Sequence, residues 1–154
     1  MMRKLKLLIL VISLMSTAAH PAPKEIDWND LIPWTAVFSP GEVKFNKSLV
    51  DKEVKIPGYV LPLDMFGRDI NSFLLVPYIG ACIHVPPPAP NQIVYVEAEV
   101  PWQGLAWWEP VYVTGKIKIE NQNIEDLAIV GYEMSASDIE YYRGETGTHG
   151  FFDW

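Results

Sequence analysis

Hydrophobic and polar residues alternate along much of this chain with the period of two that is typical of β-strands. In the segment 116–119 lysine and isoleucine alternate strictly, whereas the run 72–78 is almost entirely apolar, as in a strand buried on both faces. Glycine and proline separate the apolar segments, and patterns of helical period are scarce. We therefore expect strands at 53–63, 72–78, 92–100, 110–119 and 127–134.

Five short strands with little helix predict an all-β fold, a small five-stranded Greek-key barrel of the oligonucleotide/oligosaccharide-binding (OB) type with short peripheral helices. Gly58 follows Pro57 in the middle of the first strand, where glycine permits the bend that a strand shared by two sheets needs. Gly115 and Gly131 are expected to mark further bends. The alternative is a seven-stranded sandwich, which would require additional strands within 34–47.

Two short helical segments are predicted at the periphery. A turn is expected at 27–31, capped by Asp27 and ended by Pro33. Ser137 and Glu140 have the spacing of a capping box, which predicts a short C-terminal helix up to residue 143.

The N-terminus has the features of a cleavable signal peptide. Three basic residues precede an apolar run at 7–15, which is too short to anchor the chain in a bilayer. Small residues at 16–19 follow, and we expect cleavage after Ala19 and a periplasmic mature protein. No cysteine lies near this junction, which argues against a lipoprotein. The alternative is a retained anchor.

The expected division of the chain and its net charge limit the classes of partner that the protein can bind. We expect a signal peptide at 1–19, an N-terminal segment packing on the barrel at 20–52, the barrel with its short C-terminal helix at 53–143, and a glycine- and aromatic-rich tail at 144–154. Loss of three basic residues with the signal peptide takes the basic count from 12 to 9 against 19 acidic residues, a net charge of −10. Such a surface repels phosphate backbones and anionic lipid, so nucleic acid is not an expected partner.

One run, GACIHVPPPAPNQIVYV at 80–96, carries the chain's candidate chemistry. It holds the only cysteine, Cys82, and one of three histidines, His84. In an extended strand these two side chains project from the same face, and thiolate and imidazole are ligands of zinc and copper. Two ligands are too few for a tight site. Further ligands would come from His149, His20, Asp64, Glu97 or Asp153.

Two other interpretations of Cys82 and His84 stay open. A lone cysteine in an apolar stretch is often a small core residue, with a nearby histidine that forms structural hydrogen bonds. Alternatively, His84 lowers the pKa of the thiol for redox or nucleophilic chemistry, with Asn91 and Gln92 as orienting and donor groups. A single cysteine forms no internal disulfide.

Aromatic residues and prolines near this run suggest contact surfaces. Residues 86–90 form a stiff polyproline connector, after which Asn91 and Gln92 are expected to cap backbone groups. The connection between the third and fourth strands carries three tryptophans that are either a core plug or a surface for a partner or ligand: Trp102, Trp107 and Trp108. The aromatic tail at 151–154 either docks on the barrel or is offered to a partner.

Four stretches together resemble an uncharacterised family of bacterial exported proteins: KIPGYVLPLD, FLLVPYIGACIHVPPPAPNQIVYV, PVYVTGKI and VGYEMSASDIEYY. The similarity covers roughly 28–142, and the run around Cys82 is its most specific part. The resemblance implies an OB-like barrel and an envelope location. It also implies a gene located near those of ABC-type export and metal-responsive envelope systems. It implies no activity.

The leading functional hypothesis is a non-enzymatic periplasmic accessory or binding protein of an envelope transport or metal-handling system, with zinc or copper held by Cys82, His84 and His149. Its expected partner is an ABC-type transport system or another periplasmic protein. The alternatives are a thiol-dependent enzyme or redox protein that uses Cys82, and a purely structural protein-binding module.

Overall fold

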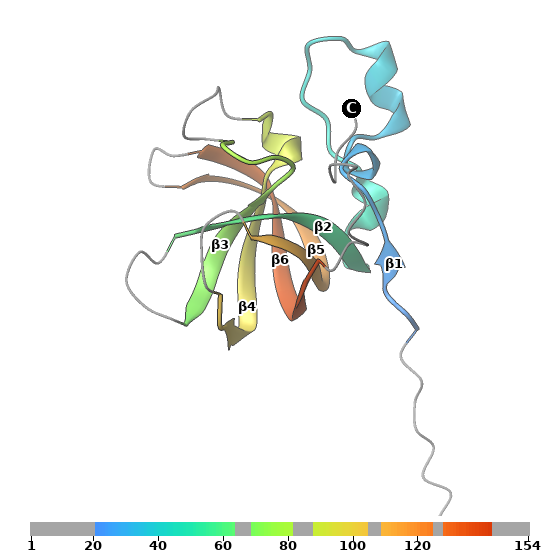
Figure 1. Cartoon of the computed structure of the whole chain (residues 1–154). Coiled ribbons are helices and arrows are strands. Elements are labelled where there is room, and N and C mark those ends of the chain that lie inside the picture. Colours follow the sequence, from blue (N-terminus) through green and yellow to red (C-terminus); the bar gives the residue numbers. More distant parts are fainter. Residues whose placement is uncertain (1–20, 64–68, 82–87, 105–108, 125–127, 143–154) are drawn as a thin grey trace, which may run out of the picture.

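The computed structural model describes residues 21–63, 69–81, 88–104, 109–124 and 128–142 (Figure 1). The strands are β1 (Lys24–Glu25), β2 (Glu53–Pro62), β3 (Ile70–Val76), β4 (Val94–Trp102), β5 (Pro110–Ile124) and β6 (Ala128–Tyr141). Short 3₁₀ helices occupy η1 (Asn29–Leu31), η2 (Trp34–Phe38), η3 (Lys47–Leu49) and η4 (Pro90–Gln92). The predicted all-β class with short helices is therefore confirmed. Within the described residues, no helix is both long enough and apolar enough to cross a membrane.

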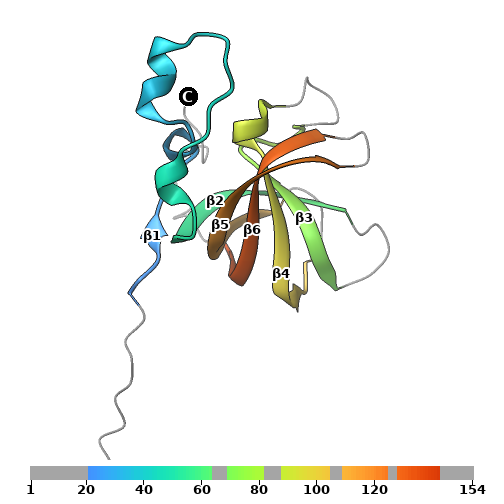
Figure 2. The same ribbon diagram turned by 180° about the vertical axis from the view of Figure 1, so that it is seen from behind.

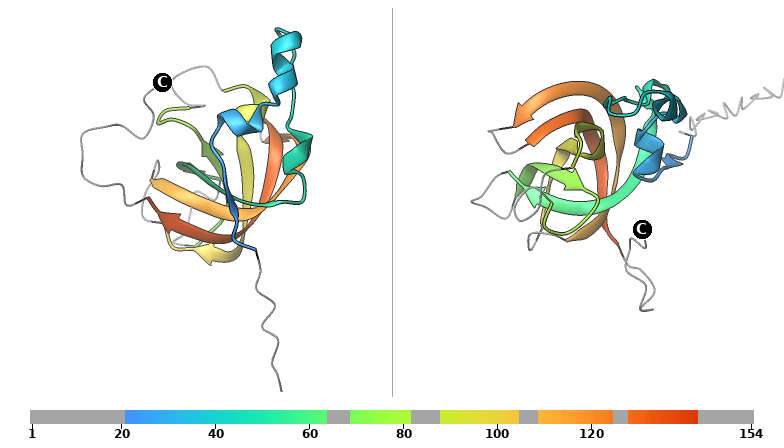
Figure 3. Two further views of the ribbon diagram at one scale, coloured as in Figure 1. Left: turned by 90° about the vertical axis from the view of Figure 1, so that its right-hand side faces the viewer. Right: turned by 90° about the horizontal axis from the view of Figure 1, so that it is seen from above.

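The strands form one mixed six-stranded sheet whose pairings close on themselves. The order is β1-β2-β3-β4-β6-β5, and β2 also pairs with β5. The five strands from β2 to β6 therefore form a closed circuit of pairings, which we call the strand circuit. Only the pairs β1–β2 and β4–β6 are parallel. Seen from above, the strands curve around a common centre (Figure 3).

The five predicted strands correspond to β2 through β6, but the predicted strand count of five is wrong. The sixth strand, β1, has only two residues and lies beside β2. Two residues are too few to show a period of two, which is why the sequence pattern did not indicate it. The strands that a sandwich would need within 34–47 are not present, because η2, the loop after it and the first residue of η3 occupy that range.

The predicted C-terminal helix is wrong, whereas the predicted turn near the N-terminus is confirmed. Ser137 and Glu140 lie in β6, which pairs with β5 up to the Val111–Tyr141 pair. A capping box is a local preference worth about 1 kcal/mol, and the continuous ladder with β5 outweighs it. At η1, by contrast, the Asp27 carboxylate accepts hydrogen bonds from the first backbone amides, as predicted.

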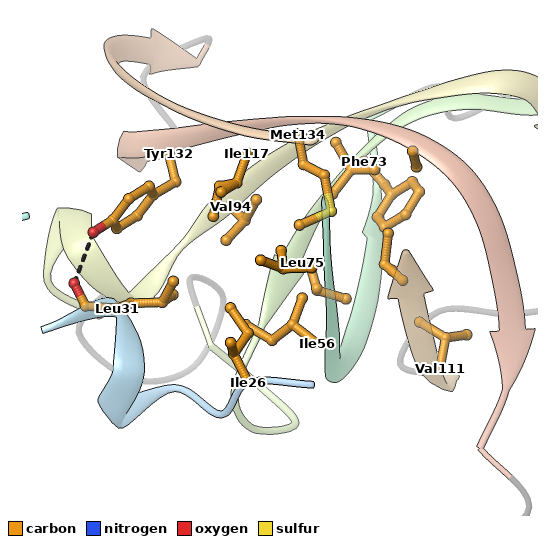
Figure 4. Packing of buried hydrophobic residues seen from close by; sticks show 14 of the residues in the cluster. Ile26, Leu31, Ile56, Phe73, Leu75, Val94, Val111, Ile117, Tyr132 and Met134 are labelled. Atoms are coloured by element: carbon orange, nitrogen blue, oxygen red, sulfur yellow. Dashed lines mark hydrogen bonds between the residues drawn. The ribbon is translucent and has the colours of Figure 1, made fainter. Parts of the chain in front are cut away.

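The main core fills the centre of the strand circuit (Figure 4). Alternate residues of β2, such as Val54 and Ile56, point inward and are fully buried. On β3, Phe73 and Leu75 belong to this core, while Leu74 and Val76 belong to a second apolar cluster. Because successive side chains of a strand point to opposite faces, β3 is buried on both faces, as its apolar sequence predicted.

The N-terminal segment supplies part of the main core. Trp28 and Leu31 are almost completely buried, and the Trp28 indole nitrogen donates to the Pro57 carbonyl at 2.8 Å. A side chain at Gly58 would collide with Leu75 and approach the Trp28 ring, so glycine makes room for this packing. At Gly58 the β2–β5 ladder continues without a bulge, and β2 changes partner from β5 to β3 around Tyr59.

Tyr132 of β6 holds the N-terminal segment at this end of the strand circuit. Its hydroxyl donates to the Leu31 carbonyl at 2.7 Å (Figure 4). It also accepts from the Asn46 amide at 2.6 Å. A phenol is protonated at neutral pH and can donate, and burial raises the pKa of Tyr132 further above its ordinary value.

We expect Tyr132→Phe to destabilise the fold by about 1 kcal/mol, because the Leu31 carbonyl and the Asn46 amide each lose the phenol and keep only the 3.2 Å bond between them. Chemical denaturation followed by circular dichroism measures the change. Tyr95→Phe is the matched control, since the Tyr95 hydroxyl bonds Glu97 at the surface, and we expect it to change stability by less than about 0.5 kcal/mol. Equal losses in the two variants would contradict the structural role of Tyr132.

A second test concerns Gly115, which lies at a register shift in the β5–β6 ladder. A Cβ there would stand 2.2 Å from the Ser135 carbonyl oxygen, which is backbone and cannot rotate away. Gly115→Ala is expected to cost about 2–3 kcal/mol or more in the free energy of unfolding. Lys116→Ala, at the exposed neighbouring position, should cost less than about 0.5 kcal/mol. A Gly115→Ala protein as stable as wild type would show that the two strands can separate at no cost.

Candidate functional site

Three large apolar side chains on η2 are exposed to solvent, and we call this group the aromatic tip. Trp34, Val37 and Phe38 are 76%, 78% and 73% exposed. The Trp34 and Phe38 rings contact each other edge to face, with centroids 5.7 Å apart. η2 and the turn after it stand away from the strands in both views (Figures 1 and 2). The described residues therefore leave these side chains uncovered.

Local sequence explains why the chain forms this projection. Pro33 has a φ of −68° and precedes the helix, where a missing amide proton costs nothing. Backbone bonds from Ala36 to Pro33 and from Ser39 to Ala36 close the two turns of η2. Gly41 has a φ of +86°, a left-handed conformation that reverses the chain and that side chains rarely adopt.

The loop that follows Gly41 is bonded back to the end of η2. The Lys44 ammonium donates to the Ser39 hydroxyl at 2.5 Å and lies 3.7 Å from the Glu42 carboxylate. Both contacts lie near the surface, so each contributes modestly to stability.

A groove of about 700 Å³ lies at the base of the aromatic tip. The groove is lined by Pro33, Trp34 and Thr35, by the segment 44–48, which includes Lys44 and Lys47, and by Ile119 of β5. Its described lining residues include these two lysines and no carboxylate. We call it the tip groove.

The base of the tip groove is held in place by buried contacts. The Phe45 ring meets the Tyr132 ring edge to face, with centroids 5.4 Å apart. It occupies the space that a side chain at residue 131 would need, since a Cβ on Gly131 would lie 2.0 Å from the Phe45 ring. Asn46 donates its side-chain amide to the Asp30 carbonyl at 2.7 Å. The aromatic tip therefore stands on a well-packed base.

Asn91 and Gln92, predicted as backbone caps and as a contact surface, bind backbone of the N-terminal segment. Asn91 is buried, and its amide nitrogen donates to the Lys44 carbonyl at 2.8 Å. The Gln92 amide nitrogen donates to the Trp28 carbonyl at 2.9 Å. Both residues thus connect the end of the proline-rich connector to the segment that carries the aromatic tip.

Trp102, predicted as either a core plug or a ligand surface, packs against the core. Its ring lies 6.4 Å from Phe73 and 5.4 Å from Tyr141 between centroids. A Cβ on Gly104 would collide with the Trp102 ring, so glycine allows the chain to cover it. Trp102 also lines a groove of about 310 Å³. Trp107 and Trp108 lie outside the described residues.

Most of the predicted metal ligands lie outside the described residues. Cys82, His84 and His149 lie outside the described residues, as do the further candidates His20, Asp64 and Asp153. Glu97 is described, and its exposed carboxylate accepts a hydrogen bond from the Tyr95 hydroxyl at 3.2 Å. Within the described part of the chain, no three His, Cys, Asp or Glu side chains gather as a metal site would require. The metal site therefore stays a prediction.

One carboxylate of the described structure is nearly buried, and it is fully paired. Glu133 accepts from the Lys118 ammonium at 2.8 Å and from the Gln122 amide at 2.9 Å. The bond to Glu133 raises the pKa of Lys118. Every buried side-chain nitrogen or oxygen in the described ranges has a hydrogen-bond partner.

Sequence reasoning missed the aromatic tip. The signal was present, because residues 32–41 contain ten consecutive uncharged residues, IPWTAVFSPG. Such a run usually belongs to a buried segment, and only the fold shows that its large side chains face solvent.

Comparisons with known proteins place the chain in a family. The model of the family described as "Protein of unknown function (DUF3299)" matches residues 28–141. The crystal structure of a DUF3299 family protein from Pseudomonas aeruginosa PAO1 is 37% identical, with a TM-score of 0.70, over 81% of this chain and 99% of that chain. A putative aspartyl-tRNA synthetase from Leishmania major Friedlin is 18% identical over 82% of this chain and 22% of that one, but its TM-score of 0.45 is too low to support an inference. No curated protein matches the chain. The family model covers most of this chain, and the bacterial protein is similar to it over nearly the whole length of the bacterial protein. The chain therefore belongs to the DUF3299 family.

Proposed function

We propose that this chain is an exported, non-enzymatic accessory protein of the cell envelope that binds a protein partner through the aromatic tip. The observation that carries the proposal is the exposure of about three quarters of each of the three apolar side chains, Trp34, Val37 and Phe38. Single exposed apolar residues are common on protein surfaces, but a contiguous group of large ones marks an interaction site.

The energetics favour a partner over a structural role for the tip. Burying a side chain of this size contributes about 1.5–3 kcal/mol, and none of that gain is realised while the three residues face water. In the 3₁₀ helix η2, Trp34 and Val37 are three residues apart and so lie on one face, and the Phe38 ring contacts the Trp34 ring. The three side chains therefore present one apolar group to a partner. Aromatic residues are also the usual centres of binding energy at protein interfaces.

We infer that the strand circuit is an OB-type barrel to which β1 is added. The circuit runs β2-β3-β4-β6-β5 and back to β2, and its strands β4 and β6 are parallel. This pairing supports the predicted Greek-key connection. The acidic net charge of −7 argues against an oligonucleotide as ligand, which leaves the barrel as a scaffold for the tip.

The envelope location rests on the sequence. The basic start, the short apolar run at 7–15 and the small residues before position 20 support export to the periplasm. In that compartment the expected partner is a component of an ABC-type envelope transport system or another periplasmic protein. Metal handling through Cys82 and His84 is the second part of this proposal, and it rests on the Cys-x-His spacing alone.

The binding proposal predicts that a Trp34→Ala/Phe38→Ala variant loses its partner and keeps its fold. Both side chains are largely exposed, so the melting temperature should change by no more than a few degrees, equivalent to less than about 1 kcal/mol. The measurement is in-cell cross-linking followed by purification and identification of the attached protein. Val100→Ala is the matched control, because Val100 is 74% exposed but lies on β4. Recovery of the same protein with the double variant would contradict the proposal.

The metal hypothesis predicts that the protein binds Zn²⁺ or Cu⁺ with a Kd of about micromolar or tighter in the presence of reductant, and that the metal raises its melting temperature. Cys82→Ser and His84→Ala should each abolish both effects. Calorimetric titration and thermal melts with and without zinc make the measurement. Equal losses of stability in the two variants, independent of zinc, would instead assign the pair to core packing. A thiol that alkylates rapidly at neutral pH in the folded protein would favour the redox alternative.

A further inference from the structure

The tip groove differs in charge from the rest of the molecule. The chain carries 19 acidic and 12 basic residues, yet the described lining of the groove holds two lysines and no carboxylate. A cationic groove on an acidic protein selects for an anionic occupant, because like charges elsewhere on the surface disfavour other modes of approach.

The two lysines of the groove differ in whether their ammonium groups already have partners. The Lys44 ammonium is already bonded to Ser39 and lies near Glu42. Lys47 is exposed, and no carboxylate of the described residues lies within ion-pair distance of it. Lys47 is therefore the group of the groove that is available for a new ion pair.

Four apolar residues line the rest of the groove, beside the polar residues Thr35, Asn46 and Ser48. Pro33, Trp34, Phe45 and Ile119 line the groove together with the two lysines. A volume of about 700 Å³ lies within the range of about 300–1,000 Å³ that is typical of ligand sites, and it accommodates one or two large side chains. Because Phe45 is packed on Tyr132, the lining is preorganised for binding.

We propose that the tip groove receives a segment of the partner protein in which an aromatic side chain is flanked by a carboxylate, with the ring against Phe45 and Ile119 and the carboxylate paired with Lys47. This inference rests on the proposed function and names the chemistry of the partner. The aromatic tip and the tip groove then form one continuous surface, which projects anchors into the partner and accepts one in return.

A protein segment explains the surface better than a membrane. The aromatic tip with nearby lysines has the composition of a membrane-binding loop, but Glu42 is exposed beside it and the chain is acidic overall. A concave groove also contributes nothing to insertion into a flat bilayer. Membrane binding is therefore the alternative outcome of the test.

The test uses two small probes of the same shape and opposite charge, indole-3-acetate and tryptamine. Amide chemical shifts of the ¹⁵N-labelled protein are followed at low salt during each titration. We expect both probes to shift the amides of Trp34, Phe45 and Ser48, with indole-3-acetate binding about two- to fivefold more tightly, as expected for one exposed ion pair. Lys47→Glu should reverse this preference, and Lys116→Glu, which changes an exposed lysine of β5 outside the groove, should leave it intact.

Several results would overturn the inference. Equal affinity of the two probes, shifts confined to other surfaces, an absence of binding, or a reversal that Lys116→Glu also produces would each do so. If the tip variant still loses the partner in cells, the proposed function survives such a result. Sedimentation of the wild-type protein with phosphatidylglycerol vesicles, lost in Trp34→Ala/Phe38→Ala, would assign the surface to membrane instead.

The chain's own C-terminal residues provide one further control. Residues 151–154, FFDW, combine aromatic rings with a carboxylate and so carry the same chemistry as the proposed occupant. The probes are therefore also titrated into a Phe151→Ala/Phe152→Ala/Trp154→Ala variant. Unchanged affinity is the expected result. A clear rise in probe affinity would assign the groove to the chain's own tail and overturn the proposal of a partner segment.

Discussion

A single phenol hydroxyl, that of Tyr132, joins two segments that are far apart in the sequence. It donates to the Leu31 carbonyl and accepts from the Asn46 amide, two backbone groups of the N-terminal segment that also bond each other at 3.2 Å. Its ring lies in the main core, and Phe45 packs against it. The burial of Leu31 and the position of the tip groove both depend on this contact.

The N-terminal segment is consequently part of the folding unit. Trp28 and Leu31 contribute to the same core as the inward residues of β2 and β5, and Asn91 and Gln92 donate hydrogen bonds to carbonyls of the segment. Polar groups of the segment are thus paired where it is buried, as interior packing requires. Only η2 and the following turn leave this base, and they carry exposed large apolar residues that no described residue covers. The contrast between the held base and the uncovered tip is the physical reason to look for a partner there.

Local pattern and long-range pairing conflicted at one end of the chain. Ser137 and Glu140 satisfy a capping box, and an isolated peptide with this sequence would favour a helix start. In the protein, the same residues continue β6 because β5 offers a partner strand along its whole length. The many hydrogen bonds of the β5–β6 ladder outweigh a local preference of about 1 kcal/mol. A short window of sequence does not reveal whether a partner strand exists elsewhere in the chain.

The sequence by itself determined the all-β class, the places of five strands and the turn at Asp27, because each depends on neighbours within a few residues. Gly115 also followed from the sequence as a point of irregularity, which the register shift of β5 confirms. Only the tertiary structure decided that β2 pairs with both β3 and β5, that Asn91 binds Lys44, and that Trp34 and Phe38 face solvent. These features join residues separated by tens of positions, or depend on what covers a side chain. The hydrophobicity of a residue shows only that its burial is favourable. Whether the side chain is buried depends on which other residues the fold places over it.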